Sequence, residues 1–218
     1  MTNSPKGHFI VIEGLEGAGK STALHTIKNV LDSYNIDFMT TREPGGTVIG
    51  ERLRSMIKSL DSGKTLDART ELLLLYASRV QLLQEVVYPA LQDGKWVLAD
   101  RFELSTYAYQ GGGRQLDKTF IDCLSQYCLQ GLKPDITLFL DVSPEKGLQR
   151  AQKRSQFDRI EQESLSFFDK VYERYHSLIK DLDNVVVVDA NQQLSAVQKD
   201  IASVFTQYIK NHAVNVSY

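Results

Sequence analysis

The sequence lacks a long apolar run, a cysteine framework and an excess of charge of either sign. Its longest unbroken apolar stretch, residues 72–77, is far too short to span a bilayer, and the polar start at residues 1–7 contains no signal-peptide core. Cys123 and Cys128 are too few for a zinc site and lie five apart in a predicted helix, where they are poorly placed to bridge. A net charge of −2 lacks the basic excess of a DNA-wrapping protein. We therefore expect a cytoplasmic protein with reduced thiols.

The composition is that of an ordinary globular protein, with 42% hydrophobic and 24% charged residues among 218. A chain of this length buries a substantial core without disulfides, so we expect one domain, residues 1–218, with a mobile insert. Apolar runs rich in β-branched and aromatic residues alternate with stretches of helical periodicity. The predicted strands are residues 9–12, 36–41, 96–99, 136–142 and 185–188, and the predicted helices are residues 22–31, 48–59, 68–92, 118–129, 145–153, 163–182 and 195–210.

This alternation predicts an α/β fold in which helices flank a parallel sheet. Each predicted strand is short and almost uniformly apolar, as expected for strands that are covered on both faces. Ligands of such sheets bind beyond the carboxyl ends of the strands. The residues that directly follow each predicted strand are therefore the candidates for a functional site.

A phosphate-binding motif directly follows the first predicted strand. Residues 14–21 match the P-loop pattern G-x-x-x-x-G-K-[ST] between a strand and a helix. Glycines let backbone N–H groups approach a phosphate chain, and the helix N-terminus adds partial positive charge. We expect Lys20 to neutralise the β- and γ-phosphates and the Ser21 hydroxyl to reach Mg²⁺. The candidate ATP-binding residues are Gly14, Leu15, Glu16, Gly17, Ala18, Gly19, Lys20, Ser21 and Thr22.

Charged residues near the ends of two predicted strands would complete a phosphate site. Glu16, inside the motif, is unfavourable beside phosphate, so it faces either solvent or another partner such as a sugar hydroxyl. Asp100 and Arg101 follow the third predicted strand. An acid at that place serves Mg²⁺ or its water, and an arginine grips a second phosphate; a structural ion pair is the alternative.

Two further segments each allow a functional and a plain interpretation. Residues 42–46, Arg-Glu-Pro-Gly-Gly, form a rigid turn after the second predicted strand, which either aims charge at the same edge of the sheet or is only a turn. Ser105, Thr106, Tyr109 and Gln110 either read the edge of a base from one helix face or lie on a solvated helix.

In this order on one chain, residues 14–21, 42–46, 100–101, 109–112 and 158–161 resemble the motifs of bacterial-type thymidylate kinases, and the likeness covers nearly the whole sequence. The resemblance implies a P-loop nucleoside monophosphate kinase fold with a five-stranded parallel sheet. It implies transfer of the γ-phosphoryl group of ATP to dTMP, giving dTDP and ADP in dTTP biosynthesis. It also implies Mg²⁺ as cofactor and a homodimer, with no nucleic-acid or membrane partner.

The resemblance assigns roles to individual residues. Lys20, Asp100 and Arg101 are implied to be catalytic, with Asp100 and Ser21 assisting Mg²⁺ directly or through water. Glu16 matches the acid that holds the 3′ side of the deoxyribose, and Arg101 matches the residue that grips the dTMP phosphate. The other residues of the implied dTMP site are Glu43, Arg54, Leu75, Arg79, Ser105, Thr106, Tyr109 and Gln110.

Five of these residues match positions with a specific contact. Arg79, Thr106 and Gln110 match positions that read the thymine edge. Arg54 matches a second phosphate-contacting arginine, and Tyr109 matches an aromatic residue beside the sugar, where a 2′-hydroxyl would clash. The resemblance therefore implies separate contacts for base, sugar and phosphate.

The resemblance offers two places for the catalytic arginine. One subtype carries it in the P-loop directly after the acid, where this chain has Gly17. The other carries it in a lid, which corresponds to residues 150–161, a charge-rich segment with little apolar content that we expect to be mobile. We expect Arg154 to be that residue, with Arg150 and Arg159 as alternatives, and we expect Arg150 and Arg154 to contact ATP.

One position departs from the family pattern, and other classes of protein compete with this reading. Leu75 stands where family members usually carry a phenylalanine that stacks on thymine. A P-loop kinase for another nucleoside or nucleotide is one alternative, which Glu16 together with Asp100 and Arg101 disfavours. A GTP-binding switch would carry an Asn-Lys-x-Asp motif, which the sequence lacks, and a degenerate scaffold would not need an intact Lys20.

Overall fold

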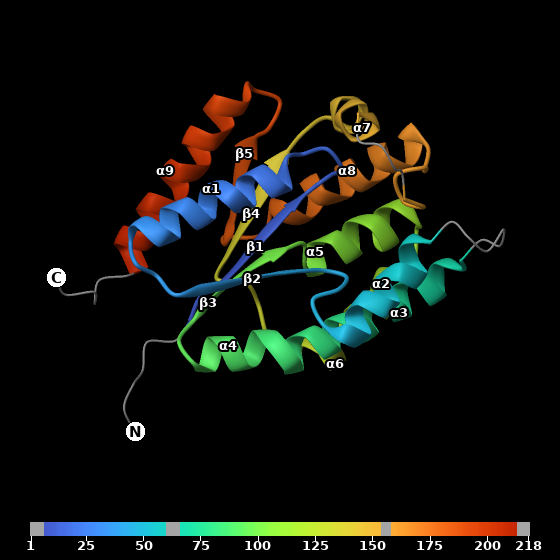
Figure 1. Cartoon of the computed structure of the whole chain (residues 1–218). Helices are drawn as coiled ribbons and strands as arrows, with labels where there is room; N and C mark the ends of the chain where they lie inside the picture. The colour runs from blue at the N-terminus through green and yellow to red at the C-terminus, as the bar shows by residue number, and fades with distance from the viewer. Residues whose placement is uncertain (1–6, 60–65, 154–157, 213–218) are drawn as a thin grey trace.

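The computed structural model describes residues 7–59, 66–153 and 158–212, which form a sheet between two layers of helices (Figure 1). The strands are β1 (Phe9–Gly14), β2 (Phe38–Arg42), β3 (Trp96–Asp100), β4 (Ile136–Asp141) and β5 (Val185–Asp189). The α-helices are α1 (Lys20–Ser33), α2 (Val48–Lys58), α3 (Ala68–Leu82), α4 (Tyr88–Gln92), α5 (Glu103–Thr106), α6 (Lys118–Leu129), α7 (Pro144–Gln152), α8 (Leu165–Ile179) and α9 (Leu194–His212), and two π-helical stretches are η1 (Leu83–Val87) and η2 (Tyr107–Gly113).

The five strands of the described residues form one parallel sheet in the order β2-β3-β1-β4-β5. β1 is central, and its register pairs Ile12 with Asp100 and Gly14 with Leu140. Because the strands are parallel, their carboxyl ends meet at one edge. The start of the P-loop and Asp100 therefore lie side by side, and the predicted fold class is confirmed.

Helices cover both faces of the sheet because successive strand residues point to opposite faces. Ile10 and Ile12 of β1 belong to the hydrophobic cluster that includes α1 and α9. Phe9 and Val11 belong to the cluster built with α3, α4 and α6. Figure 1 shows α1 and α9 on one side of the sheet and α4 and α6 on the other.

A charged residue, Glu13, continues the Phe9–Val11 face toward the carboxyl end of β1. Its register partner on β4 is Phe139, and Tyr175 of α8 packs against Phe139 with ring centroids 5.0 Å apart. Glu13 is fully buried. A carboxylate is therefore enclosed between the sheet and α8, next to the P-loop.

The segment after β3, which both interpretations of residues 105–110 took to be a helix, is helical, although apolar periodicity did not mark it. α5 runs directly into η2, whose sequence ends in three glycines of low helix propensity. A tertiary contact supports its start, because the Glu13 carboxylate accepts hydrogen bonds from the backbone N–H groups of Phe102 and Ser105. The segment therefore depends on a residue about ninety positions away in the sequence.

The strands and helices that the periodicity predicts are present, with bounds shifted by at most three residues. The predicted helix 68–92 forms as α3, η1 and α4 in unbroken succession. Cys123 and Cys128 are both free thiols, as expected. No helix in the three described ranges is both long enough and apolar enough for a membrane span.

Candidate active site

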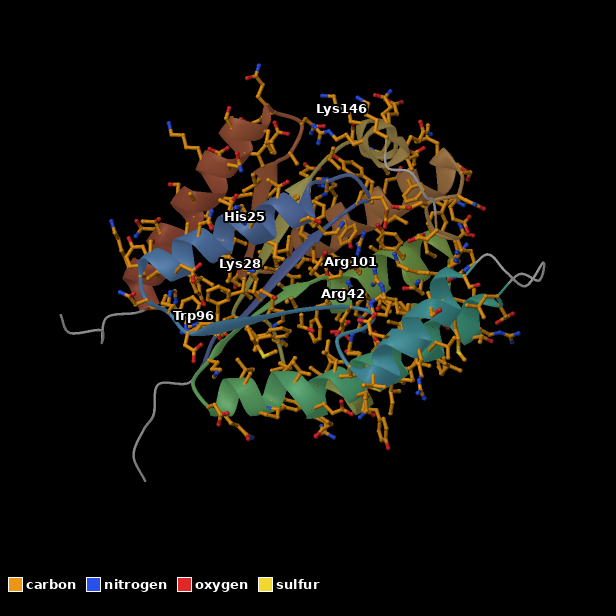
Figure 2. All side chains as sticks on the ribbon, viewed as in Figure 1. His25, Lys28, Arg42, Trp96, Arg101 and Lys146 are labelled. Atoms are coloured by element: carbon orange, nitrogen blue, oxygen red, sulfur yellow. The ribbon has the colours of Figure 1, made fainter. Side chains whose placement is uncertain are left out.

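A cavity of about 680 Å³ lies at the carboxyl ends of β1, β2 and β3, a volume typical of small-molecule sites. Figure 2 shows Arg101 and Arg42 at this end of the sheet and Trp96 at the opposite end. Most residues predicted for nucleotide binding line the cavity. They are Glu16, Gly17, Gly19, Lys20, Ser21, Thr22, Glu43, Arg54, Leu75, Arg79, Asp100, Arg101, Ser105, Thr106, Tyr109 and Gln110.

The lysine of the P-loop folds back on its own loop. Lys20 Nζ donates to the carbonyl oxygens of Gly14 and Leu15 at 3.0 and 2.8 Å. Burial, and secondly the nearby Arg101 guanidinium, lower the pKa of Lys20 to about 8, although neighbouring carboxylates oppose this shift. A phosphate at this place would favour the charged lysine, because it adds negative charge within reach of Nζ.

Three other P-loop positions have no side chain directed into the cavity. Leu15 and Ala18 are buried in the hydrophobic core, so only their backbone groups can face a phosphate. Gly17 has a φ of +70°, and a Cβ there would lie 2.0 Å from the carbonyl oxygen of Gly147 in α7. Position 17 is therefore closed to an arginine, as the sequence already indicates by its glycine.

Arg101 is the centre of a buried hydrogen-bond cluster after β3. Its Nη2 donates to Glu16 Oε1 at 2.7 Å and to the Tyr109 hydroxyl at 3.1 Å, and its Nη1 donates to Ser105 Oγ at 3.0 Å and to the Tyr175 hydroxyl at 3.4 Å. Tyr109 donates to Glu16 Oε2 at 2.5 Å. Burial by itself raises the pKa of Glu16, but Arg101 and the P-loop lysine more than offset this and lower it. Glu16 is therefore an ionised carboxylate facing Arg101 rather than solvent.

A carboxylate and a hydroxyl are in place for a magnesium ion. Asp100 lines the cavity, and its Oδ1 is buried without a hydrogen-bond partner among the described residues. Ser21 lines the same cavity. Within the described ranges, no group of three or more His, Cys, Asp or Glu residues could hold a metal alone. A magnesium ion at this place would therefore need phosphate oxygens and water to complete its six ligands.

Arg79 of α3 is a buried cation on the cavity wall. Its Nε pairs with Glu43 Oε2 at 2.7 Å, and its Nη2 donates to Thr106 Oγ1 at 2.9 Å and to the Phe102 carbonyl at 3.2 Å. Burial raises the pKa of Glu43 to about 7, against the opposing effect of Arg79. Arg79 Nη1 has no partner in the described part of the chain. Arg79 therefore offers an unused hydrogen-bond donor to a ligand.

Leu75 lies one helical turn before Arg79 and also lines the cavity. The next residue, Tyr76, is buried and does not line it. The Arg79 Cζ lies 4.9 Å from the centroid of the Tyr76 ring, and the Tyr76 hydroxyl donates to Glu103 Oε1 at 3.2 Å. The side chain at the predicted stacking position is therefore that of Leu75, and Tyr76 does not replace it.

A second buried carboxylate, Glu71 of α3, connects three parts of the chain. Gln110 Nε2 donates to Glu71 Oε1 at 2.6 Å, Arg114 Nη2 donates to Oε2 at 3.3 Å, and Arg159 also pairs with Oε2. Arg114 Nη1 pairs in addition with Glu163 at 2.5 Å. Burial raises the pKa of Glu71, but the two arginines and Gln110 lower it overall. Glu71 is therefore an ionised carboxylate whose contacts connect α3 to η2 and to the end of the predicted lid.

The remaining predicted residues differ in their position. Arg54 lines the cavity and donates to the Pro44 carbonyl at 2.8 Å. Arg150 does not line it, and its Nη1 donates to the Ala190 carbonyl, just after β5, at 2.9 Å. Arg154 lies outside the described residues. The buried Thr106, Tyr109 and Gln110 exclude the solvated-helix interpretation of that segment.

Among the residues that the sequence motifs did not include, Glu13, Glu71 and Tyr175 make the most buried polar contacts beside the cavity. Glu13 carries a detectable signal, because it is a charge that continues a uniformly apolar strand. Glu71 and Tyr175 carry none, because a charged or aromatic residue on an amphipathic helix is ordinary. Their contacts only exist once separate elements pack together.

A central strand that leads into a P-loop, with further arginines across the same cavity, defines the class of P-loop nucleotide kinases. A model of the thymidylate kinase family matches residues 12–201. A thymidylate kinase of Legionella pneumophila (strain Corby) is 54% identical over 210 residues, covering 96% of this chain and 99% of the relative. One of Colwellia psychrerythraea is 48% identical over 205 residues, covering 94% and 97%. The chain belongs to the thymidylate kinase family, and it is a phosphotransferase that uses ATP.

Proposed function

We propose that this cavity is where the γ-phosphoryl group of ATP passes to dTMP, with the P-loop holding the donor and the wall formed by α3 and η2 holding the acceptor. The reaction breaks the bond between the β–γ bridging oxygen and the γ-phosphorus, and it joins that phosphorus to a phosphate oxygen of dTMP. The supporting observation is that Lys20, Arg101 and the unused Arg79 donor line one cavity. Phosphate-binding and base-reading groups therefore face the same space.

On the donor side, Lys20 exchanges its contacts with two loop carbonyls for contacts with the β- and γ-phosphates. Backbone N–H groups of residues 14–21 and the N-terminus of α1 supply further positive potential. Ser21 and Asp100 would hold Mg²⁺, directly or through water, and the unpartnered Asp100 Oδ1 supports this assignment. When bound, the ion neutralises charge on the phosphates.

On the acceptor side, Arg101 and Arg54 bind the dTMP phosphate through charge-assisted hydrogen bonds. Glu16 and Tyr109, which are joined to each other and to Arg101, form the wall beside the deoxyribose. The Ser105 hydroxyl already contacts Arg101, so it acts on dTMP through that guanidinium. Sugar and phosphate recognition are therefore parts of one hydrogen-bond cluster.

The base lies between α3 and η2. Arg79 Nη1 donates to a thymine carbonyl, while Glu43 and Thr106 hold the rest of the guanidinium. Because Gln110 Nε2 is committed to Glu71, the amide oxygen of Gln110 remains to accept from the base. Leu75 supplies the apolar contact with the ring.

The transferred phosphoryl group also requires a cation that stabilises its equatorial oxygens. Gly17 excludes an arginine from the P-loop. We assign this role to Arg154, in a lid formed by residues 150–161 of a single kinase domain. The neighbouring arginines are already engaged, because Arg150 bonds to Ala190 and Arg159 pairs with Glu71.

The assembly we propose is a homodimer in the cytoplasm, where the two free thiols stay reduced. α3 packs against both α2 and α6, and these helices expose large apolar side chains. They are Met56 on α2, Leu73 on α3, and Phe120 and Tyr127 on α6. An apolar surface over adjacent helices is typical of a protein–protein interface.

Release of ADP, measured with dTMP, dUMP, dAMP, dCMP and thymidine as acceptors, tests the proposed function. We expect dTMP to give the highest kcat/KM, because base and phosphate contacts are both needed. Lys20→Ala is the control for the P-loop and should lower turnover by several orders of magnitude without unfolding the protein. Preference for thymidine or for another nucleotide would overturn the acceptor assignment.

A further inference from the structure

The buried carboxylate of Glu13 has no part in the functions assigned so far, although it is saturated with hydrogen-bond donors. Its Oε1 accepts from the backbone N–H groups of Phe102 at 2.9 Å and Ser105 at 3.2 Å. Its Oε2 accepts from the hydroxyls of Ser105 at 2.6 Å and Tyr175 at 2.8 Å. A carboxylate can accept all four bonds, whereas no neutral side chain of the same shape can.

These bonds determine which way the two hydroxyls point. Ser105 and Tyr175 each have one hydroxyl proton, and each hydroxyl lies within hydrogen-bonding distance of Glu13 Oε2. The two hydroxyls also lie 2.8 Å from each other, so each proton is directed at Glu13 or at the other hydroxyl and not at Arg101. Their oxygen lone pairs are therefore free to accept from Arg101 Nη1, which lies 3.0 Å from Ser105 Oγ and 3.4 Å from the Tyr175 hydroxyl. The negative charge of Glu13 thus arranges acceptors around the arginine without touching it.

Glu13 also holds the backbone on the C-terminal side of Arg101. Arg101 has a φ of +71°, a left-handed conformation that a non-glycine residue adopts only when its surroundings impose it. The Arg101 N–H donates to the Ile12 carbonyl at 2.9 Å, and the next N–H, that of Phe102, donates to Glu13. Ile12 and Glu13, two successive residues of β1, therefore hold the backbone by hydrogen bonds at the left-handed residue Arg101.

We propose that Glu13 is a positioning residue, which aims the Arg101 guanidinium at the acceptor phosphate by fixing both its backbone and the hydroxyls that accept from it. This inference rests on the proposed role of Arg101 in binding the phosphate of dTMP. Glu13 itself does not contact substrate. It acts through Phe102, Ser105 and Tyr175.

Glu13→Gln is the direct test, because the amide keeps the shape but replaces one acceptor by a donor. The amide NH₂ turns a hydroxyl proton toward Arg101, or opposes the two backbone N–H groups. We expect kcat/KM for dTMP to fall about 10²-fold, the loss typical of a misplaced reacting group, and the KM for ATP to change less than about twofold. A merely structural role would lower the melting temperature without this selective loss for dTMP.

Tyr175→Phe removes one of the two oriented hydroxyls and leaves the carboxylate intact. We expect a smaller loss of the same kind, about tenfold in kcat/KM for dTMP. The matched control is Tyr88→Phe, which removes a tyrosine hydroxyl bonded to the Leu129 carbonyl in α6, and it should leave both substrates unaffected. If Glu13→Gln does not fold, the comparison of Tyr175→Phe with Tyr88→Phe tests the positioning role instead. A loss of kcat/KM for dTMP in Tyr175→Phe alone supports it, and equal values in the two variants overturn it.

A double-mutant cycle with Arg101→Ala separates this inference from the function on which it rests. If Glu13 acts through Arg101, Glu13→Gln should cost no more than about twofold once Arg101 is alanine. Additive losses, or no loss for dTMP in Glu13→Gln while Arg101→Ala is impaired, would overturn the positioning role alone. An unchanged kcat/KM for dTMP in Arg101→Ala itself would overturn the proposed role of Arg101.

Discussion

The charge of a single lysine controls the donor half of the site. Because the pKa of Lys20 is about 8, the free enzyme loses this positive charge as the pH rises through that value. Phosphate binds the protonated form, so we expect kcat/KM for ATP to fall above about pH 8. Initial rates at limiting ATP between pH 7 and 10 measure this limb.

Lys20→Arg is the control for that profile, because arginine stays charged over the whole range. The variant should be less active but should show no alkaline limb in kcat/KM for ATP. An identical limb in Lys20→Arg would show that another group titrates.

At Leu75 we predict a substitution that increases affinity, whereas the changes at Lys20 lower activity. Leucine gives the base an apolar contact but no π-face, and base–aromatic stacking is worth about 1–3 kcal/mol by truncation. We expect Leu75→Phe to lower the Kd for dTMP about threefold to tenfold, with the KM for ATP unchanged. Equilibrium binding of dTMP measures the effect. Weaker binding would show that the cavity is packed around leucine.

At the scale of elements, α3 carries most of the wall that we propose for the acceptor. Glu71, Leu75 and Arg79 lie four residues apart and so share one helix face. Glu71 anchors this face to η2 through Gln110, to Arg114 directly after η2, and to the end of the proposed lid through Arg159. The helix, the π-helical stretch and the end of the proposed lid therefore meet at one carboxylate.

Removing the Glu71 charge should destabilise the whole arrangement. Glu71→Gln removes the buried carboxylate that pairs with the partly buried Arg114 and Arg159, and breaking a buried pair in this way costs about 3 kcal/mol or more. We expect the melting temperature to fall by about 6–12 °C for a chain of this size. Glu51→Gln is the control, because its exposed pair with Arg42 should be worth less than about 1 kcal/mol. Equal shifts of the melting temperature in the two variants would contradict this stabilising role of Glu71.

The lid supplies the second prediction at this scale. Arg154→Ala should lower kcat about 10³- to 10⁵-fold with little change in the KM for dTMP, because the lost interaction is made only in the transition state. Arg150→Ala and Arg159→Ala should affect kcat far less, since these arginines bond to Ala190 and Glu71. Steady-state kinetics of the three variants tests this assignment. A larger loss of kcat in Arg150→Ala or Arg159→Ala than in Arg154→Ala would assign the role to that arginine instead.

At the scale of the whole molecule, the exposed apolar face predicts self-association. Sedimentation equilibrium should give twice the 24.6 kDa of the chain. On α6, Phe120, Cys123 and Tyr127 share one face by their spacing, and all three are exposed. Tyr127→Glu should therefore yield monomers, whereas Lys118→Glu at the exposed start of the same helix should not. A monomeric unmodified protein would contradict the proposed dimer.

Besides the cavity residues that the resemblance to thymidylate kinases implied, the sequence by itself determined the parallel sheet and the P-loop. These depend on local patterns: apolar strands alternating with helical periodicity, and glycines at fixed spacing between a strand and a helix. Gly17 belongs here too, since a glycine at this position already excludes an arginine side chain from it. Only the tertiary structure gave the reason, which is the carbonyl of Gly147 packed against it.

The tertiary structure alone decided how the charges are held. Glu13 and Tyr175 are 162 positions apart, and Glu71 and Arg159 are 88 positions apart. No local pattern encodes such a contact, because it forms only when strand, helix and lid pack into one buried space. The helix α5, which leads into the η2 stretch with Tyr109 and Gln110, also has a tertiary support, because the distant Glu13 carboxylate accepts from the backbone N–H groups of Phe102 and Ser105 at its start.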